Sequence, residues 1–107
     1  MADNMLFIEN PIFTHDVATL LTDQEFAQFQ AYLAFNPNSG DVIPDSGGLR
    51  KIRWPSKGKG KRGGVRVIYF HKSAFYVIRL LLIYQKGIKT DLSEAEKQLL
   101  RKLNERW

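Results

Sequence analysis

The sequence has 107 residues, 44% of them hydrophobic, which suits one compact domain over residues 1–107 and leaves little length for a second. It has no cysteine, no apolar run long enough to span a bilayer and no basic signal-peptide region at its start, which excludes a disulfide framework and favours a soluble, cytoplasmic protein without membrane contact. The net charge is +5, and the bases are concentrated: residues 46–90 contain twelve Lys or Arg and no acid, whereas residues 1–45 contain seven acids and no Lys or Arg.

The first third of the chain predicts one strand and two helices. Residues 5–8 form a short apolar run that ends at an Asn-Pro turn, and residues 12–21 carry apolar side chains at helical spacing. Thr22 and Glu25 have the spacing of a capping box, in which each side chain bonds the backbone N–H of the other residue. A second helix is therefore expected to begin at this box and to end before the Asn-Pro pair at 36–37.

The rest of the chain predicts three strands and a final helix. Residues 49–54, 65–70 and 75–84 are rich in β-branched and aromatic side chains, so we expect consecutive antiparallel strands. A second capping box, Ser93 with Glu96, begins the last helix. The expected fold is α+β: an N-terminal helical pair packed on a small, mainly antiparallel twisted sheet, with a C-terminal helix.

One face of the predicted last helix carries an apolar stripe. Its members repeat every four residues: Ala95, Leu99, Leu103 and Trp107. Such a stripe normally packs on the core, so we expect these side chains to be buried. The alternative is that the helix moves, or becomes covered, when a partner binds.

Residues 57–64 connect two predicted strands and consist of four cations and four glycines. Glycine lets backbone N–H groups approach a phosphate, and Lys and Arg supply charge and hydrogen bonds to its oxygens. This composition favours binding of an RNA backbone, although an ordinary solvated loop, or a solvated sheet face beside it, can have a similar one. The spacing of a nucleotide-triphosphate loop is absent.

Arg66 is expected inside a strand between apolar neighbours, where an unpaired guanidinium would be costly. Arg66 needs a partner, either a substrate phosphate or a carboxylate from the helices. The same argument applies to Arg79, for which the position in the strand gives weaker support. His15 and His71 lack the local signature of a hydrolytic triad, and no metal motif is present. The chemistry that remains is metal-free RNA cleavage, in which a base activates the ribose 2′-OH, cations stabilise the phosphorane, and an acid protonates the leaving oxygen.

Two stretches carry a resemblance to a known family: GGLRKIRW at residues 47–54 and GKGKRGGVRVIY at residues 58–69. They resemble the HigB branch of the RelE superfamily, and the likeness extends over nearly the whole chain. The resemblance implies the toxin of a bacterial type II toxin–antitoxin system, a ribosome-dependent endoribonuclease that cleaves mRNA in the A site and inhibits translation without a metal or cofactor. The implied partners are a cognate helix-turn-helix antitoxin and mRNA on the 70S ribosome, with operator DNA bound only through the antitoxin.

The resemblance also implies a set of site residues. Those expected to be catalytic are Lys57, Lys59, Lys61, Arg66 and Lys86. The resemblance leaves base stacking to either Tyr69 or Tyr84, and the basic composition of this block adds Arg50, Lys51, Arg53 and Arg62 as residues expected to bind RNA. Two other hypotheses fit the same charge pattern: a non-catalytic RNA- or ribosome-binding module, and a protein-interaction domain whose basic face binds an acidic partner.

Overall fold

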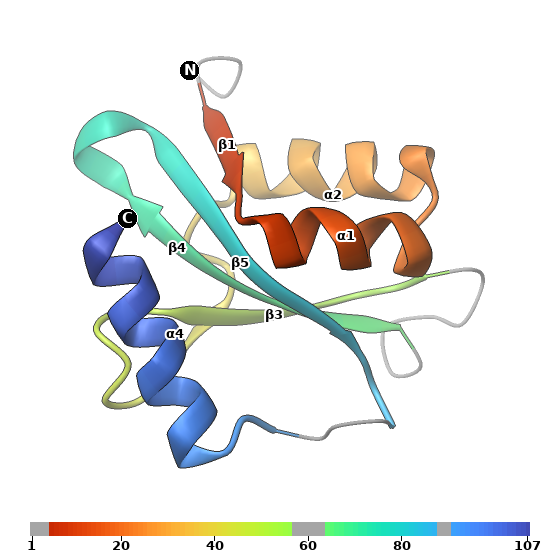
Figure 1. Cartoon of the computed structure of the whole chain (residues 1–107). Coiled ribbons are helices and arrows are strands. Elements are labelled where there is room, and N and C mark those ends of the chain that lie inside the picture. Colours follow the sequence, from red (N-terminus) through yellow and green to blue (C-terminus); the bar gives the residue numbers. More distant parts are fainter. Residues whose placement is uncertain (1–4, 57–63, 88–90) are drawn as a thin grey trace.

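The computed structural model describes residues 5–56, 64–87 and 91–107, and it shows the predicted α+β fold (Figure 1). The strands are β1 (Leu6–Glu9), β2 (Asp41–Val42), β3 (Arg50–Trp54), β4 (Val65–Lys72) and β5 (Val77–Gln85). The helices are α1 (Pro11–Leu20), α2 (Asp23–Phe35) and α4 (Glu94–Arg106).

The strands form one sheet of five, in the order β1-β5-β4-β3-β2. As predicted, β3, β4 and β5 are consecutive antiparallel neighbours, and the short β2 pairs antiparallel with β3. β1 is parallel to β5 at one edge of the sheet. β5 begins at Val77, two residues later than expected, because Ser73–Phe75 form a short 3-10 turn and Tyr76 has a left-handed backbone (φ 53°).

Local capping explains where the helices begin. The side chain of Asn10 accepts a hydrogen bond from the backbone N–H of Phe13 at the start of α1. Both predicted capping boxes are present, at Thr22 for α2 and at Ser93 for α4. These bonds satisfy backbone donors that have no partner within the helix, which fixes each helix start independently of the rest of the fold.

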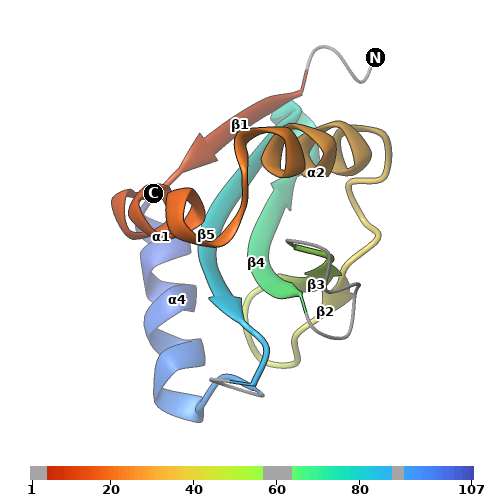
Figure 2. The same cartoon turned by 90° about the vertical axis from the view of Figure 1, so that its right-hand side faces the viewer.

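The helices cover the two faces of the sheet, so that the sheet lies between two layers (Figure 2). α1 and α2 pack on one face, where the buried cluster includes Phe13, Phe29 and Val67. α4 packs on the other face over a smaller buried cluster: Leu49, Ile68, Leu81, Tyr84 and Leu100. Within the described residues, no helix is long and apolar enough to cross a membrane.

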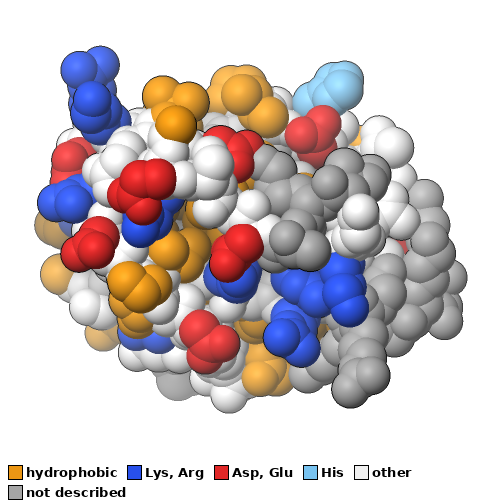
Figure 3. Space-filling view, turned by 90° about the horizontal axis from the view of Figure 1, so that it is seen from below, with side chains coloured by type: hydrophobic (Ala, Val, Ile, Leu, Met, Phe, Trp, Pro, Cys, Tyr) orange, Lys and Arg blue, Asp and Glu red, His pale blue; other side chains and the backbone are white. Residues whose placement is uncertain are grey.

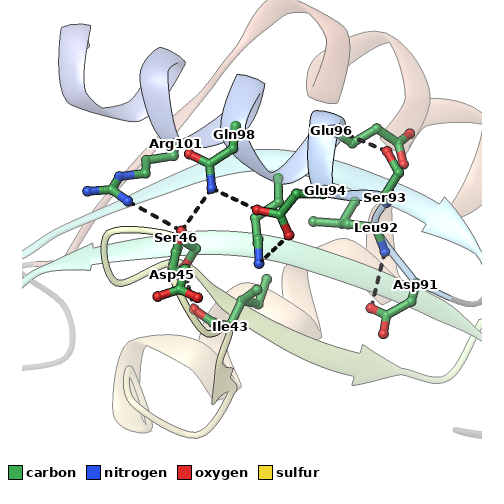
Figure 4. A network of polar contacts seen from close by, with 11 residues as sticks. Ile43, Asp45, Ser46, Asp91, Leu92, Ser93, Glu94, Glu96, Gln98 and Arg101 are labelled. Carbon is green, nitrogen blue, oxygen red and sulfur yellow. Dashed lines mark hydrogen bonds and ion pairs between the residues drawn. The ribbon is translucent and has the colours of Figure 1, made fainter.

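The prediction for the apolar stripe of α4 was wrong. The helix buries Leu100 and Asn104, whereas Leu99 is 68% exposed and Leu103 and Trp107 are also exposed. The reason is the set of polar contacts that orient the helix: Gln98 and Arg101 both donate hydrogen bonds to the carbonyl of Asp45, and the Ser93 capping box fixes the helix start (Figure 4).

A second polar contact fixes the other end of α4. Arg79 of β5 donates hydrogen bonds to the carbonyl and the side-chain oxygen of Asn104, at 2.8 and 3.1 Å, and to the carbonyl of Trp107 at 3.3 Å. A cation beside the C-terminal carbonyls also complements the helix dipole. The partner that Arg79 requires is thus the end of α4.

Candidate functional site

The sheet divides the predicted RNA-binding residues between its two faces. Side chains of a strand alternate in direction, and the register opposes Arg50 to Tyr69 and Arg53 to Arg66. Tyr69 belongs to the cluster under α1 and α2, whereas Tyr84 belongs to the cluster under α4. Arg50 and Tyr69 therefore lie on the opposite face from Lys51, Arg53 and Tyr84.

Tyr69 is a structural residue. Its side chain is 0% exposed, and its hydroxyl accepts a hydrogen bond from the N–H of Gly40 and donates one to the carbonyl of Pro37, both at 2.9 Å. Burial, the largest effect, raises the pKa of Tyr69. Arg50 Nη1 donates hydrogen bonds to the same segment, residues 37–40, through the carbonyls of Asn38 and Gly40. The expectation that Tyr69 stacks on RNA fails because its ring has no exposed face.

Three polar side chains form a row across the sheet on the α4 side. Arg53 of β3 opposes Arg66 of β4, which opposes Tyr84 of β5. Neighbouring strands are about 4.8 Å apart, so the row extends over about 10 Å. We call Arg53, Arg66 and Tyr84 the cross-strand row.

Arg66 lies at the centre of this row and is 6% exposed. Its Nη1 donates a hydrogen bond to the carbonyl of Val65 at 3.2 Å. Loss of hydration is the largest effect that lowers the pKa of Arg66, and the charge of Arg53 adds to it, while Tyr84 acts in the opposite direction. Arginine stays protonated at neutral pH despite such a shift. The row therefore places two positive charges side by side on one face of the sheet.

Tyr84 is 8% exposed, and its hydroxyl oxygen has no hydrogen-bond partner among the described residues. Burial raises the pKa of Tyr84, as does the charge of Asp91, while Arg66 lowers it. The hydroxyl is therefore protonated at neutral pH and can donate a hydrogen bond. Buried polar groups normally have a partner, and unpaired ones in native proteins often belong to functional sites.

Lys86 follows β5 at the same end of the sheet. Its side chain is exposed, and its backbone N–H donates to the carbonyl of Gly64 at 3.1 Å. Gly64 packs so closely on the end of β3 that a Cβ atom there would clash with the carbonyl oxygen of Trp54. The expected site residues Lys57, Lys59, Lys61 and Arg62 lie outside the described residues, but the described ends of that segment, Ser56 and Gly64, lie next to the cross-strand row in the register.

Lys51 lies on the same face as the row and pairs with Asp91, at 3.1 Å between Nζ and Oδ1. The hydrogen bond from Lys51 is the largest effect that lowers the pKa of Asp91. Figure 3 shows the molecule from below, where the largest group of Lys and Arg side chains lies right of the centre and others lie among acidic side chains toward the left. Sequence reasoning missed Asp91 because its partner lies 40 positions away in the chain.

The two histidines, His15 and His71, lie away from the cross-strand row. His71 lies at the end of β4, where its Nδ1 is 2.8 Å from the side-chain oxygen of Asn38, and burial lowers its pKa. His15 is exposed on α1 beside Asp16. Among the described residues, no group of three or more His, Asp or Glu side chains could hold a metal ion. No model of a known protein family matches the chain.

Proposed function

We propose that the protein is a metal-independent endoribonuclease that acts on ribosome-bound mRNA, as the toxin of a type II toxin–antitoxin pair. The observation that carries this proposal is the cross-strand row. The buried guanidinium of Arg66 lies beside the buried hydroxyl of Tyr84, which has no hydrogen-bond partner in the part of the chain that the structure describes, on a face rich in cations. A phosphate oxygen is the ligand that both groups would bind, the first as a charged donor and the second as a neutral one.

The row supplies two of the three functions that RNA cleavage needs. Arg66 stabilises the negative charge that develops on the phosphorane, because it is preorganised and already dehydrated. Tyr84, whose pKa is raised, acts as a donor to a phosphate oxygen or as the acid that protonates the leaving oxygen. The base that activates the 2′-OH is assigned to a lysine, either Lys86 at the end of β5 or one of Lys57, Lys59 and Lys61.

The proposed partners follow from the same site and from the resemblance. The RNA substrate is single-stranded mRNA in the ribosomal A site, and a cognate helix-turn-helix antitoxin holds the protein inactive in the bacterial cytoplasm. The antitoxin in turn carries the complex to operator DNA.

The test is inducible expression in bacteria of the wild type, Arg66→Ala and, as a matched control, Arg106→Ala on the exposed face of α4. We expect growth arrest and new mRNA 5′ ends at ribosome-occupied codons for the wild type and Arg106→Ala, and neither for Arg66→Ala at equal abundance. If the wild type binds ribosomes but neither cuts mRNA nor slows growth, the protein is a non-catalytic ribosome-binding module.

A further inference from the structure

A cavity of about 320 Å³ lies beside the outer edge of β3, next to the cross-strand row. Its lining combines aromatic, cationic and acidic side chains: Tyr32, Asp41, Lys51, Arg53 and Trp54. Small-molecule sites start at about this size and use a few placed polar groups against an apolar wall. The ribonuclease mechanism proposed above does not use this cavity.

Two aromatic rings form one wall of the cavity. Tyr32 of α2 and Trp54 of β3 have ring centroids 5.4 Å apart at an interplanar angle of 47°. Trp54 is held from behind by the fully buried Phe29, whose ring meets it edge-on at 5.3 Å. Tyr32 is 40% exposed, so this wall is fixed on its inner side and open on its outer side. An exposed, rigid aromatic wall is the platform on which single-stranded nucleic acids stack a base.

The polar side of the cavity carries opposite charges. Arg53 lines the cavity and also belongs to the cross-strand row, whereas Trp54 belongs to the cluster under α1 and α2, so the cavity lies at the edge of β3 where the two faces of the sheet meet. Asp41 is exposed and opposes Lys51 across β2 and β3, but Lys51 forms its ion pair with Asp91. Among the described residues, the Asp41 carboxylate has no hydrogen bond or ion pair, and it is available to a ligand.

We propose that this cavity binds one nucleobase of the RNA at the edge of β3 beside Arg53, and that Asp41 makes it favour guanine over uracil. A carboxylate only accepts hydrogen bonds. Guanine presents two neighbouring N–H donors on its Watson–Crick edge, which match the two carboxylate oxygens. Uracil presents one N–H between two carbonyl oxygens, which the carboxylate repels. The inference rests on the proposed ribonuclease function, to which it adds base preference.

The first experiment measures binding without cleavage. The chain has two tryptophans, so Trp107→Phe leaves Trp54 as the only one, and its fluorescence reports on the cavity. We expect saturable quenching by GMP, binding of UMP that is at least about tenfold weaker, and no quenching by ribose 5-phosphate, which lacks a base. In this background Tyr32→Ala should weaken GMP binding about tenfold, and Asp41→Asn should remove the preference for GMP over UMP.

Matched controls come from α2 and from the segment that follows β2. Phe35→Ala removes another exposed aromatic ring of α2, and Asp45→Asn removes another exposed acid, neither of which lines the cavity. Both should bind GMP as the parent does, and unchanged melting temperatures would show that each variant is folded. Quenching by ribose 5-phosphate equal to that by GMP, or GMP binding that neither Tyr32→Ala nor Asp41→Asn changes, would overturn the inference.

The second experiment separates this inference from the proposed function. In cells, Asp41→Asn should still cut mRNA but with a changed base composition around the cut sites. If the wild type cuts and Asp41→Asn cuts with an identical pattern, the cavity does not select a base while the ribonuclease stands. If the wild type does not cut but its GMP binding depends on Asp41, the ribonuclease is refuted and the base site stands.

Discussion

Two tyrosines on opposite faces of the sheet make a sharp test of the site, because the same small change should have opposite effects on stability. Tyr84→Phe removes a buried hydroxyl that has no partner among the described residues. Burying such a group without a hydrogen bond costs about 1–3 kcal/mol. We therefore expect Tyr84→Phe to raise the free energy of unfolding by about 1 kcal/mol.

Tyr69→Phe removes a hydroxyl that makes two hydrogen bonds, and it leaves the N–H of Gly40 without this partner. We expect a loss of about 1–3 kcal/mol. For a domain of this size, 1 kcal/mol corresponds to about 4–8 °C in melting temperature. The melting temperature of Tyr84→Phe should therefore lie above that of the wild type, and the melting temperature of Tyr69→Phe below it.

The assay is urea and thermal unfolding of the two variants beside the wild type, followed by mRNA cleavage at equal concentrations. Tyr84→Phe should lose at least about tenfold in cleavage while gaining stability, the trade-off expected of a group kept for activity. Equal destabilisation by both substitutions would refute the reasoning, because it would mean that the Tyr84 hydroxyl has a stabilising partner. Full cleavage by a stable Tyr84→Phe would remove Tyr84 from the site.

Three further outcomes follow from contacts described above. Gly64→Ala should destabilise the protein by about 2 kcal/mol or more, since its Cβ would clash with the carbonyl oxygen of Trp54; a melting temperature equal to that of the wild type would contradict this close approach. Arg79→Ala should cost about 1–3 kcal/mol and reduce the helical circular dichroism signal, because the carbonyl of Asn104 loses its charged donor; an unchanged signal would mean that α4 does not depend on this contact. The raised pKa of Tyr69 means that the folded state holds the phenol proton more tightly than the unfolded chain does. The contribution of this proton to the free energy of unfolding is therefore complete below pH 10, and it is lost as the pH rises above 10 toward the pKa of the folded state. Unfolding measured between pH 8 and pH 11 should therefore show a smaller alkaline loss for Tyr69→Phe, and equal losses would refute the assignment.

Local signals in the sequence predicted most of the fold. The capping boxes at Thr22 and Ser93 involve residues three apart, so their geometry does not depend on distant parts of the chain. The three antiparallel strands were predictable for a similar reason, since each continues from its predecessor through a short connection. The parallel pairing of β1 with β5 joins residues about 70 positions apart, and no local pattern encodes it.

The candidate site was less predictable because it depends on which face of the sheet each helix covers. Alternation along β4 already separates Arg66 from Tyr69, but the strand is apolar on both faces and gives no sign of which one stays accessible. The prediction for α4 was wrong for a related reason, because the sequence did not show which face of this helix packs on the sheet. An apolar stripe containing Leu99 indicated its buried face, whereas polar contacts of Gln98 and Arg79 rotate Leu100 toward the sheet instead.

The pairing of β1 with β5 also sets an order of events during protein synthesis. Residues 6–9 are made about 70 residues before the strand that they join, residues 77–85. Contacts between such distant segments form late, because a long loop must close first. The cluster under α1 and α2 includes side chains of β5, and so does the cross-strand row. A chain that has not yet gained β5 therefore has neither a closed core nor an assembled cross-strand row.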